Sequence, residues 1–266
     1  MRRHALVIVL APIALALALA LPAGGALAQR QVVQEGGVRV TFGGHLLPRA
    51  LPRERPAPVT VRLGGTVASV DGSRPPQLRE ISIAVNRAGR LFTAGLPRCP
   101  AAAIQQTSTS TALERCRAAL VGHGRFGANV DFDVAPLFPV GGRVLVFNSR
   151  RRGRPSMLLH LFGTSPVRAA FVLPFKIERL SRGEFGTVFS ARIPKLASDL
   201  GYVTEISLTI GRTYRHAGKR RSFLSASCAA PAGFPAAIFE LAKATFTFPG
   251  EKRLVSRLQG NCRVRG

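Results

Sequence analysis

The sequence contains no tryptophan and only two tyrosines, Tyr202 and Tyr214. Surfaces that bind single-stranded nucleic acid or sugar rings depend on flat aromatic side chains, so this shortage argues against both kinds of surface. The 16 phenylalanines fall mostly at alternating positions that are typical of a core. We therefore expect no nucleic-acid partner.

Acidic residues are also scarce, with 13 Asp and Glu against 38 Lys and Arg and a formal net charge of +25. Only five of the basic residues are lysines, so 33 are arginines. Charged residues make up 19% of the chain and hydrophobic residues 46%, which excludes a highly charged disordered chain, a collagen and a coiled coil. The balance favours a globular protein that attracts anions.

Long apolar runs are absent apart from one at the start of the chain. Arg2 and Arg3 precede the apolar run from Ala5 to Leu21, and Ala26-Leu27-Ala28 supplies a signal-peptidase site. Residues 1–28 are therefore predicted to be a signal peptide, with an uncleaved membrane anchor as the alternative. We expect a secreted or cell-envelope protein with no transmembrane segment after the signal is removed.

The mature chain would hold 238 residues with a net charge of +23, because residues 1–28 carry two of the arginines. It has no cysteine at the cleavage site, which argues against a lipoprotein. A chain of this length can bury a large core in one domain.

Cysteine is limited to four residues, and none belongs to a C-x-x-C pair. An even number in an exported chain indicates two disulfides. Of the three possible pairings we favour the local ones, Cys99–Cys116 and Cys228–Cys262, because each pair brackets a short segment. Buried free thiols are the alternative.

Period-two alternation of apolar and polar residues dominates the chain from Val38 onward and predicts strands with one buried face. Three continuous apolar runs, Val144–Phe147, Met157–Phe162 and Ala169–Phe175, predict strands that are covered on both faces. The alternating segments are Val38–Phe42, Val59–Leu63, Ile81–Val85, Val130–Val134, Ile206–Ile210 and Ala244–Phe248.

Glycine and proline recur about every ten residues between these segments, which is typical of a β-sandwich or barrel. We predict an all-β fold, an antiparallel jelly-roll-like sandwich over residues 58–266, preceded by an N-terminal strand and a Pro/Arg-rich arm over residues 29–57. The predicted turns are Gly43-Gly44, Gly64-Gly65, Asp71-Gly72, Gly141-Gly142, Ser165-Pro166, Gly183, Ala217-Gly218 and Pro249-Gly250.

One short amphipathic helix is predicted over residues 110–121, with Thr111 and Glu114 as a capping box. Leu113, Cys116 and Leu120 share one face, which places Cys116 toward the sheet. Gly122 would cap the carboxyl end of this helix. Residues 100–106 can form a further short helix that starts at a proline.

Six sets of residues give the chain a family resemblance. They are Pro58-Val59-x-Val61 with Asp71-Gly72 and Pro75-Pro76-Gln77-Leu78, Gly95-Leu96-Pro97-x-Cys99-Pro100, Ala112-Leu113-x-x-Cys116 with Leu120-Val121-Gly122-x-Gly124, Leu145-Val146-Phe147-Asn148, Ser225-Ala226-x-Cys228 with Gly233-Phe234, and Cys262-Arg263-Val264-Arg265. With these residues the chain resembles a set of uncharacterised secreted proteins of high-GC actinobacteria, over nearly all of the mature chain. The resemblance implies export and a β-rich architecture, and it implies no activity.

The glycines at 122, 124 and 127 match G-x-G-x-x-G, but a dinucleotide site needs a strand before the motif and a helix after it. The order predicted here is the reverse, so we interpret the motif as a helix cap followed by the start of a strand. Asn129, Asp131 and Asp133 share one strand face, which we interpret as solvated, with a Ca²⁺ site as the alternative. We expect neither a metal nor a cofactor.

No catalytic motif with its required context occurs around the mature histidines, His45, His123, His160 and His216. His160 lies in an apolar run and is predicted to be a core residue. We expect a non-catalytic protein. The alternative is a secreted hydrolase of envelope glycans or esters, for which Glu178, Glu184 and Asp199 are the candidate carboxylates.

Two basic clusters remain as a candidate binding surface, and both are predicted at hairpin tips. The competing explanation for these clusters is that codon usage enriches arginine along the whole chain and that turns carry charged residues because they are exposed to solvent. Given the compartment, an anionic cell-envelope polymer or lipid headgroup is the expected partner. The candidate residues are Arg150, Arg151, Arg152, Arg154, Arg215, Lys219, Arg220 and Arg221.

Overall fold

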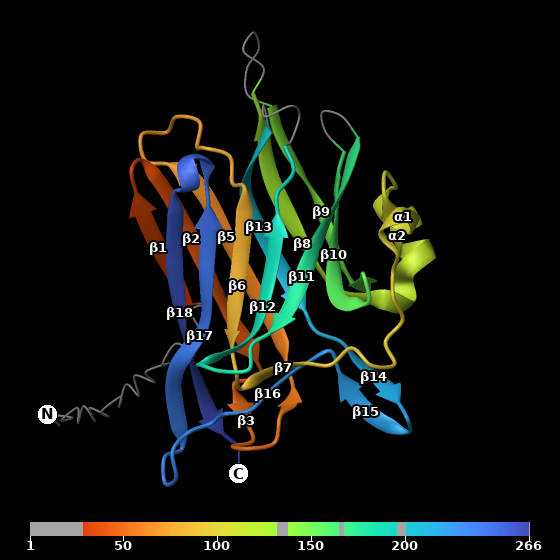
Figure 1. Ribbon diagram of the computed structural model, residues 1–266, viewed down its shortest axis with the longest axis vertical. Coiled ribbons are helices and arrows are strands. Elements are labelled where there is room, and N and C mark those ends of the chain that lie inside the picture. Colours follow the sequence, from red (N-terminus) through yellow and green to blue (C-terminus); the bar gives the residue numbers. More distant parts are fainter. Residues whose placement is uncertain (1–28, 132–137, 165–167, 196–200, 266) are drawn as a thin grey trace, which may run out of the picture.

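Thirteen strands form one hydrogen-bonded sheet in the computed structural model, which describes residues 29–131, 138–164, 168–195 and 201–265 (Figure 1). In their order across the sheet the strands are β1 (Gln29–Glu35), β2 (Val38–Leu47), β5 (Thr60–Ser69), β13 (Gly201–Ile210), β8 (Leu120–Val130), β9 (Phe138–Arg151), β10 (Arg154–Gly163), β11 (Ala169–Arg179), β12 (Phe185–Arg192), β6 (Glu80–Asn86), β17 (Ala236–Thr247), β18 (Arg253–Val264) and β3 (Ala50–Leu51).

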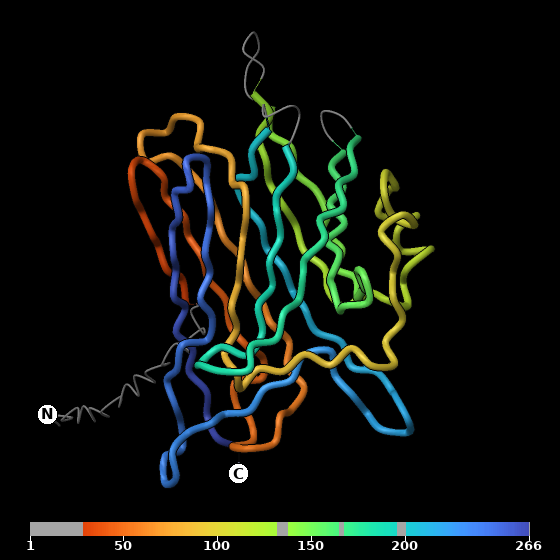
Figure 2. The backbone as a smooth tube through the Cα atoms, in the orientation of Figure 1, coloured from red at the N-terminus to blue at the C-terminus, as the bar shows by residue number. Residues whose placement is uncertain are grey.

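This sheet curls into a half-barrel, so that β1 at one edge contacts β18 near the other edge (Figure 2). Neighbouring strands are antiparallel except β18 and β3, which run parallel. The predicted all-β class is confirmed, but its arrangement differs, because the strands form one continuous curled sheet instead of the two facing sheets of a sandwich. Alternation identifies the buried face of each strand without identifying its neighbours.

Three of the glycine pairs predicted as turns lie inside strands. Gly43-Gly44 is part of β2, Gly64-Gly65 of β5 and Gly141-Gly142 of β9. A Cβ on Gly43 would lie 2.7 Å from the carbonyl oxygen of Gln29 in β1. The glycines therefore mark places where adjacent backbones approach too closely for a side chain, as a strongly coiled sheet requires.

Two of the three strands predicted to be covered on both faces are confirmed. Val144–Phe147 in β9 and Met157–Leu159 in β10 are buried, because the helical segment covers their outer face. The third strand, β11, is less covered, and Phe171 remains 39% exposed. The predicted strand 130–134 is described only as far as Asp131, and β8 ends at Val130.

The helical segment consists of α1 (Ala101–Ile104), α2 (Thr109–Cys116) and the 3₁₀ turn η1 (Arg117–Ala119). The helix begins earlier than predicted, because Ser108 and not Thr111 is its cap, and the Ser108 hydroxyl accepts a hydrogen bond from the Thr111 amide at 3.2 Å. Gly122 is not a cap, since it lies within β8.

Both predicted disulfides, Cys99–Cys116 and Cys228–Cys262, are present. The first ties the helical segment to the stretch before it, and the second ties β18 to the loop after β16 (Leu224–Ala226). Among the described residues there are no free cysteines.

A three-stranded sheet of β4 (Ala57–Pro58), β16 and β7 (Gly89–Leu91) lies across the lower end of the half-barrel in Figure 1. The Pro/Arg-rich segment therefore contributes β3 and β4. Within it, Arg53 donates hydrogen bonds to the carbonyls of Ala230, Pro231 and Phe234. The remaining elements are the hairpin of β14 (Thr213–His216) and β15 (Lys219–Ser222), and the turn η3 (Pro249–Glu251).

Two separate hydrophobic clusters line the inside of the curl. One is built mainly on β8, β9, β10 and β13, and includes Phe126, Leu159 and Phe175. The other is built on β2, β17 and β18, and includes Phe42 and Phe246, whose rings meet edge to face. Ile81 of β6 packs against both clusters.

We expect Gly124→Ala to destabilise the protein strongly, because a Cβ at this position would overlap the carbonyl of Ser207 in β13. Overpacking of this kind costs about 1–3 kcal/mol of unfolding free energy. The matched control is Gly141→Ala in β9, where the nearest atom to an added Cβ is the Phe126 carbonyl oxygen at 3.7 Å. Urea denaturation of both variants tests the prediction, and equal stabilities would contradict it.

Removal of each disulfide by paired Cys→Ala substitution should lower the free energy of unfolding, by an amount that increases slowly with the length of the loop that the disulfide closes. The sequence separations are 17 residues for Cys99–Cys116 and 34 for Cys228–Cys262. Loop entropy then gives a loss of about 3 kcal/mol for the first pair and about 4 kcal/mol for the second. Denaturant midpoints measure both losses, and an unchanged midpoint for either pair would refute its role.

His160 should make stability depend on pH. Its side chain is fully buried, and Nε2 lies 2.9 Å from the Thr107 carbonyl oxygen. Burial lowers the pKa of His160, and the bond to Thr107 only partly opposes this. An unfolded histidine takes up its proton near pH 6.5, so stability is retained above that value and falls by at most about 2 kcal/mol between pH 7 and pH 5.

A His160→Gln variant, compared with the parent chain by denaturation at pH 7 and pH 5, measures this loss. The variant should show a flatter pH dependence. The control is His123→Gln, at an exposed position of β8, which should keep the parental slope. Parallel slopes for His160→Gln and the parent chain would contradict the assignment.

Candidate functional site

The two predicted basic clusters are hairpin turns. Arg152 and Gly153 link β9 to β10, and Ala217 and Gly218 link β14 to β15, all four with positive φ. Positive φ at both central residues matches the right-handed twist of the flanking strands. All eight predicted binding side chains are exposed, namely Arg150, Arg151, Arg152, Arg154, Arg215, Lys219, Arg220 and Arg221.

Both hairpins are anchored to the segment between β7 and α1. The amide group of Asn148 in β9 donates to the carbonyls of Leu96 and Pro97. The hydroxyl of Tyr214 in β14 donates to the carbonyls of Phe92 and Ala94, at 3.2 and 2.8 Å. The two clusters therefore lie at the same lower end of the sheet (Figure 1).

Of the eight predicted binding residues, only Arg220 and Arg221 line an open hollow of about 730 Å³. Arginines from other parts of the chain line the same hollow. We call this the arginine hollow, defined by Arg87, Arg90, Arg179, Arg220 and Arg221. Three hydroxyl side chains, those of Thr187, Ser222 and Ser225, also line it. None of its lining residues is acidic.

Three of the five guanidinium groups are held in place by the fold. Arg87 donates to the carbonyls of Leu180, Gly183 and Phe185 in the β11–β12 turn, at 2.8–3.2 Å. Arg179 donates to the Leu91 carbonyl at 3.2 Å. The guanidinium carbon of Arg221 lies 5.1 Å from the centre of the Phe92 ring.

The other two, Arg90 and Arg220, have no side-chain hydrogen bond or ion pair to any described residue. Both side chains are exposed. Their donors are therefore free to form paired hydrogen bonds with a carboxylate or a phosphate. The fixed arginines supply positive charge at the same place without rearrangement.

Arg87, Arg90 and Arg179 are not among the binding residues predicted from the sequence. Each is isolated from the predicted clusters, and Arg90 and Arg220 are separated by 130 positions. No local pattern could have found them. They meet because β12 pairs with both β11 and β6, and because the β14–β15 hairpin folds back beside β7.

Two of the three residues considered for a Ca²⁺ site, at the end of β8, make contacts with other side chains. Asn129 donates to the Tyr202 hydroxyl at 3.2 Å, and Asp131 forms an ion pair with Arg74 at 3.7 Å. Asp133 lies outside the described residues. In the described ranges, no three or more His, Cys, Asp or Glu side chains gather where they could hold a metal ion.

Two of the three carboxylates considered for a hydrolase lie within the described residues. Glu178 lies near the end of β11 and Glu184 in the following turn, both exposed, whereas Asp199 lies outside the described residues. His160 is buried, as predicted, with Nδ1 unbonded. Burial also lowers the pKa of His45, with smaller contributions from Arg49 and Arg62.

The glycine motif at residues 122–127 lies entirely within β8. Gly122 pairs with Ile210 of β13, and Gly127 faces Gly141 of β9. These residues are strand backbone, so they do not form a phosphate-binding turn before a helix.

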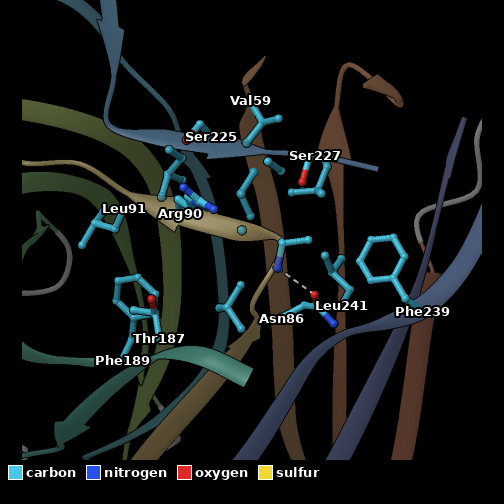
Figure 3. A pocket seen from close by; sticks show the side chains of 17 residues that line it. Val59, Asn86, Arg90, Leu91, Thr187, Phe189, Ser225, Ser227, Phe239 and Leu241 are labelled. Carbon is cyan, nitrogen blue, oxygen red and sulfur yellow. Dashed lines mark hydrogen bonds between the residues drawn. The ribbon is translucent and has the colours of Figure 1, made fainter. Parts of the chain in front are cut away.

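An apolar pocket opens next to the arginine hollow, beneath the small sheet (Figure 3). Figure 3 shows Arg90 and Leu91 of β7 together with Thr187 and Phe189 of β12, with Phe239 and Leu241 of β17 on the other side. We call this the narrow pocket, and its volume is about 50 Å³. Arg90 lines both the pocket and the hollow.

In the part of the chain that the structure describes, no helix is long and apolar enough to span a bilayer. The predicted signal peptide, residues 1–28, lies outside that part. Comparisons with protein-family models, curated proteins and solved structures find no match for this chain, so its function has to be argued from the hollow and its surroundings.

Proposed function

We propose that this chain is an exported, non-catalytic binding protein that recognises phosphate or carboxylate groups of the cell envelope. The observation that carries the proposal is the arginine hollow, in which five guanidinium groups converge with no acidic side chain among the lining residues. Arrangements of this kind attract anions and select those that accept paired hydrogen bonds.

Compartment and charge support the same function. The two disulfides fit an oxidising environment, and the predicted signal peptide leads there. Anionic envelope compounds are abundant outside the membrane, and a mature chain with a net charge of +23 is drawn to them over several ångströms. The exposed arginines of the β9–β10 turn add to this general attraction without forming part of the hollow.

The double substitution Arg90→Gln with Arg220→Gln should weaken binding of a polyanion by about tenfold or more, because two charge-assisted contacts are lost. The probe is a labelled heparin oligosaccharide, measured by fluorescence anisotropy between 50 and 200 mM NaCl. The dependence of affinity on salt should also become shallower by about one unit of slope for each lost contact.

The matched control is Arg150→Gln with Arg151→Gln, which removes the same charge from exposed positions outside the hollow. This variant should lose no more than about threefold, as expected for a change in long-range attraction alone. Equal losses in the two variants would show that net charge and not the hollow determines binding.

A further inference from the structure

An unfilled apolar cavity lies inside the curled sheet, between the two hydrophobic clusters. We call it the interior cavity, and its volume is about 130 Å³. Its walls come from both clusters, for example Met157 and Phe175 on one side and Phe42 and Leu258 on the other. The two clusters do not close on each other here, so space remains between them.

The interior cavity adjoins the narrow pocket, because the two share six lining residues, Leu46, Val61, Val85, Phe189, Leu224 and Leu241. The narrow pocket in turn shares Gly89, Arg90, Leu91, Thr187 and Ser225 with the arginine hollow. The three spaces therefore adjoin one another in order, from the charged lower end of the half-barrel to its apolar interior. Figure 3 shows the residues that line the middle one, the narrow pocket.

The side chains that line the three spaces change from charged and polar at the hollow to mostly apolar at the interior cavity. The hollow offers guanidinium groups and hydroxyls, whereas the interior cavity is lined by aliphatic and aromatic side chains, with His45 and Arg62 as its ionisable members. An apolar cavity stays dry and accepts apolar groups in preference to water. A ligand that fits all three spaces must therefore be anionic at one end and apolar at the other.

We propose that the ligand is an anionic amphiphile, whose phosphate or carboxylate binds in the arginine hollow and whose alkyl chain enters the narrow pocket and the interior cavity. This inference rests on the proposed function, since the same hollow holds the anionic group. A cavity of about 150 Å³ accepts a benzene ring, so the two apolar spaces together accommodate roughly six to eight carbon atoms.

A series of n-alkyl phosphates with two, four, six and eight carbons tests the proposal on the unmodified chain. Isothermal titration calorimetry, with inorganic phosphate as the reference, gives the affinity of each compound below its micelle concentration. We expect the affinity to rise about fourfold for each CH₂ that enters the apolar spaces, and to level off near eight carbons. The uncharged octanol should bind at least about tenfold more weakly than octyl phosphate, because it lacks the charged contacts.

Two variants test the apolar end and the anionic end of the site separately. Val85→Phe places a larger side chain in the wall that the narrow pocket and the interior cavity share, and should remove the dependence on chain length. Its control is Val70→Phe, at a residue that is 41% exposed and lines neither space. Arg90→Gln with Arg220→Gln should weaken every alkyl phosphate by the same factor. Circular dichroism and the thermal midpoint show that each variant is folded.

Each outcome decides between the two proposals. Affinity that does not depend on chain length, with phosphate still bound by the arginines, overturns the amphiphile and leaves the anion site intact. Absence of binding for every phosphate in the series, including inorganic phosphate, overturns both proposals. Octanol and octyl phosphate of equal affinity would overturn the role of the arginines while retaining the apolar spaces. If Val85→Phe does not fold, the chain-length series on the parent chain decides alone.

Discussion

The close approach of neighbouring backbones at glycine is the constraint on which this structure depends. At Gly43, Gly44, Gly65, Gly122 and Gly124 an added Cβ would meet a carbonyl oxygen of an adjacent strand, at 2.7 Å or less. These positions lie on β2, β5 and β8, which are neighbours of β13 or of one another in the sheet. A sheet with side chains there would have to flatten, and β1 would then no longer contact β18. Without the curl, the inward faces of the strands would have no opposite wall to pack against.

The curl also explains why the inside of the sheet is not full. A sheet of about eight strands closes around a volume that its own side chains can fill, and wider sheets enclose additional space. Here thirteen strands leave about 130 Å³ between two clusters. Leaving such a volume empty costs about 3 kcal/mol at roughly 24 cal/mol per Å³. A bound alkyl chain would fill this volume and recover part of this energy, so the proposed ligand would complete the packing that the fold leaves unfinished. The small sheet of β4, β16 and β7, held near the Cys228–Cys262 disulfide, forms the lower boundary where such a chain would enter.

Local patterns in the sequence predicted local structure well. Alternation over Val38–Phe42 gives a strand whose buried and exposed residues fall as expected, and the spacing of the cysteines favoured the two pairings that the structure contains. Patterns of this kind failed where a distant partner decides the outcome. Gly64-Gly65 resembles a turn until β2 and β13 lie beside it, and the half-barrel is invisible because no residue in β13 indicates that β5 and β8 are its neighbours. For the same reason Arg87, Arg90 and Arg179 carry no local sign of a site, whereas Arg220 and Arg221 do.

The excess of arginine has two parts in the structure, namely arginines that stabilise the fold and arginines whose charge remains free. Many guanidinium groups serve the fold, because they donate to loop carbonyls in a chain with only 13 carboxylates to pair with; Arg53, Arg87 and Arg212 each bind two or three such carbonyls. Arginine suits this task since its planar group presents five donors.

A preference for arginine codons can account for the number of these residues, but it does not account for where carboxylates are placed. The ion pairs of Glu80, Asp131, Glu240 and Glu251 all lie away from the lining of the arginine hollow. Arg90 and Arg220 are left without a carbonyl or a carboxylate, at a hollow that adjoins an apolar pocket. Their charge therefore belongs to the part of the excess that the fold itself does not use.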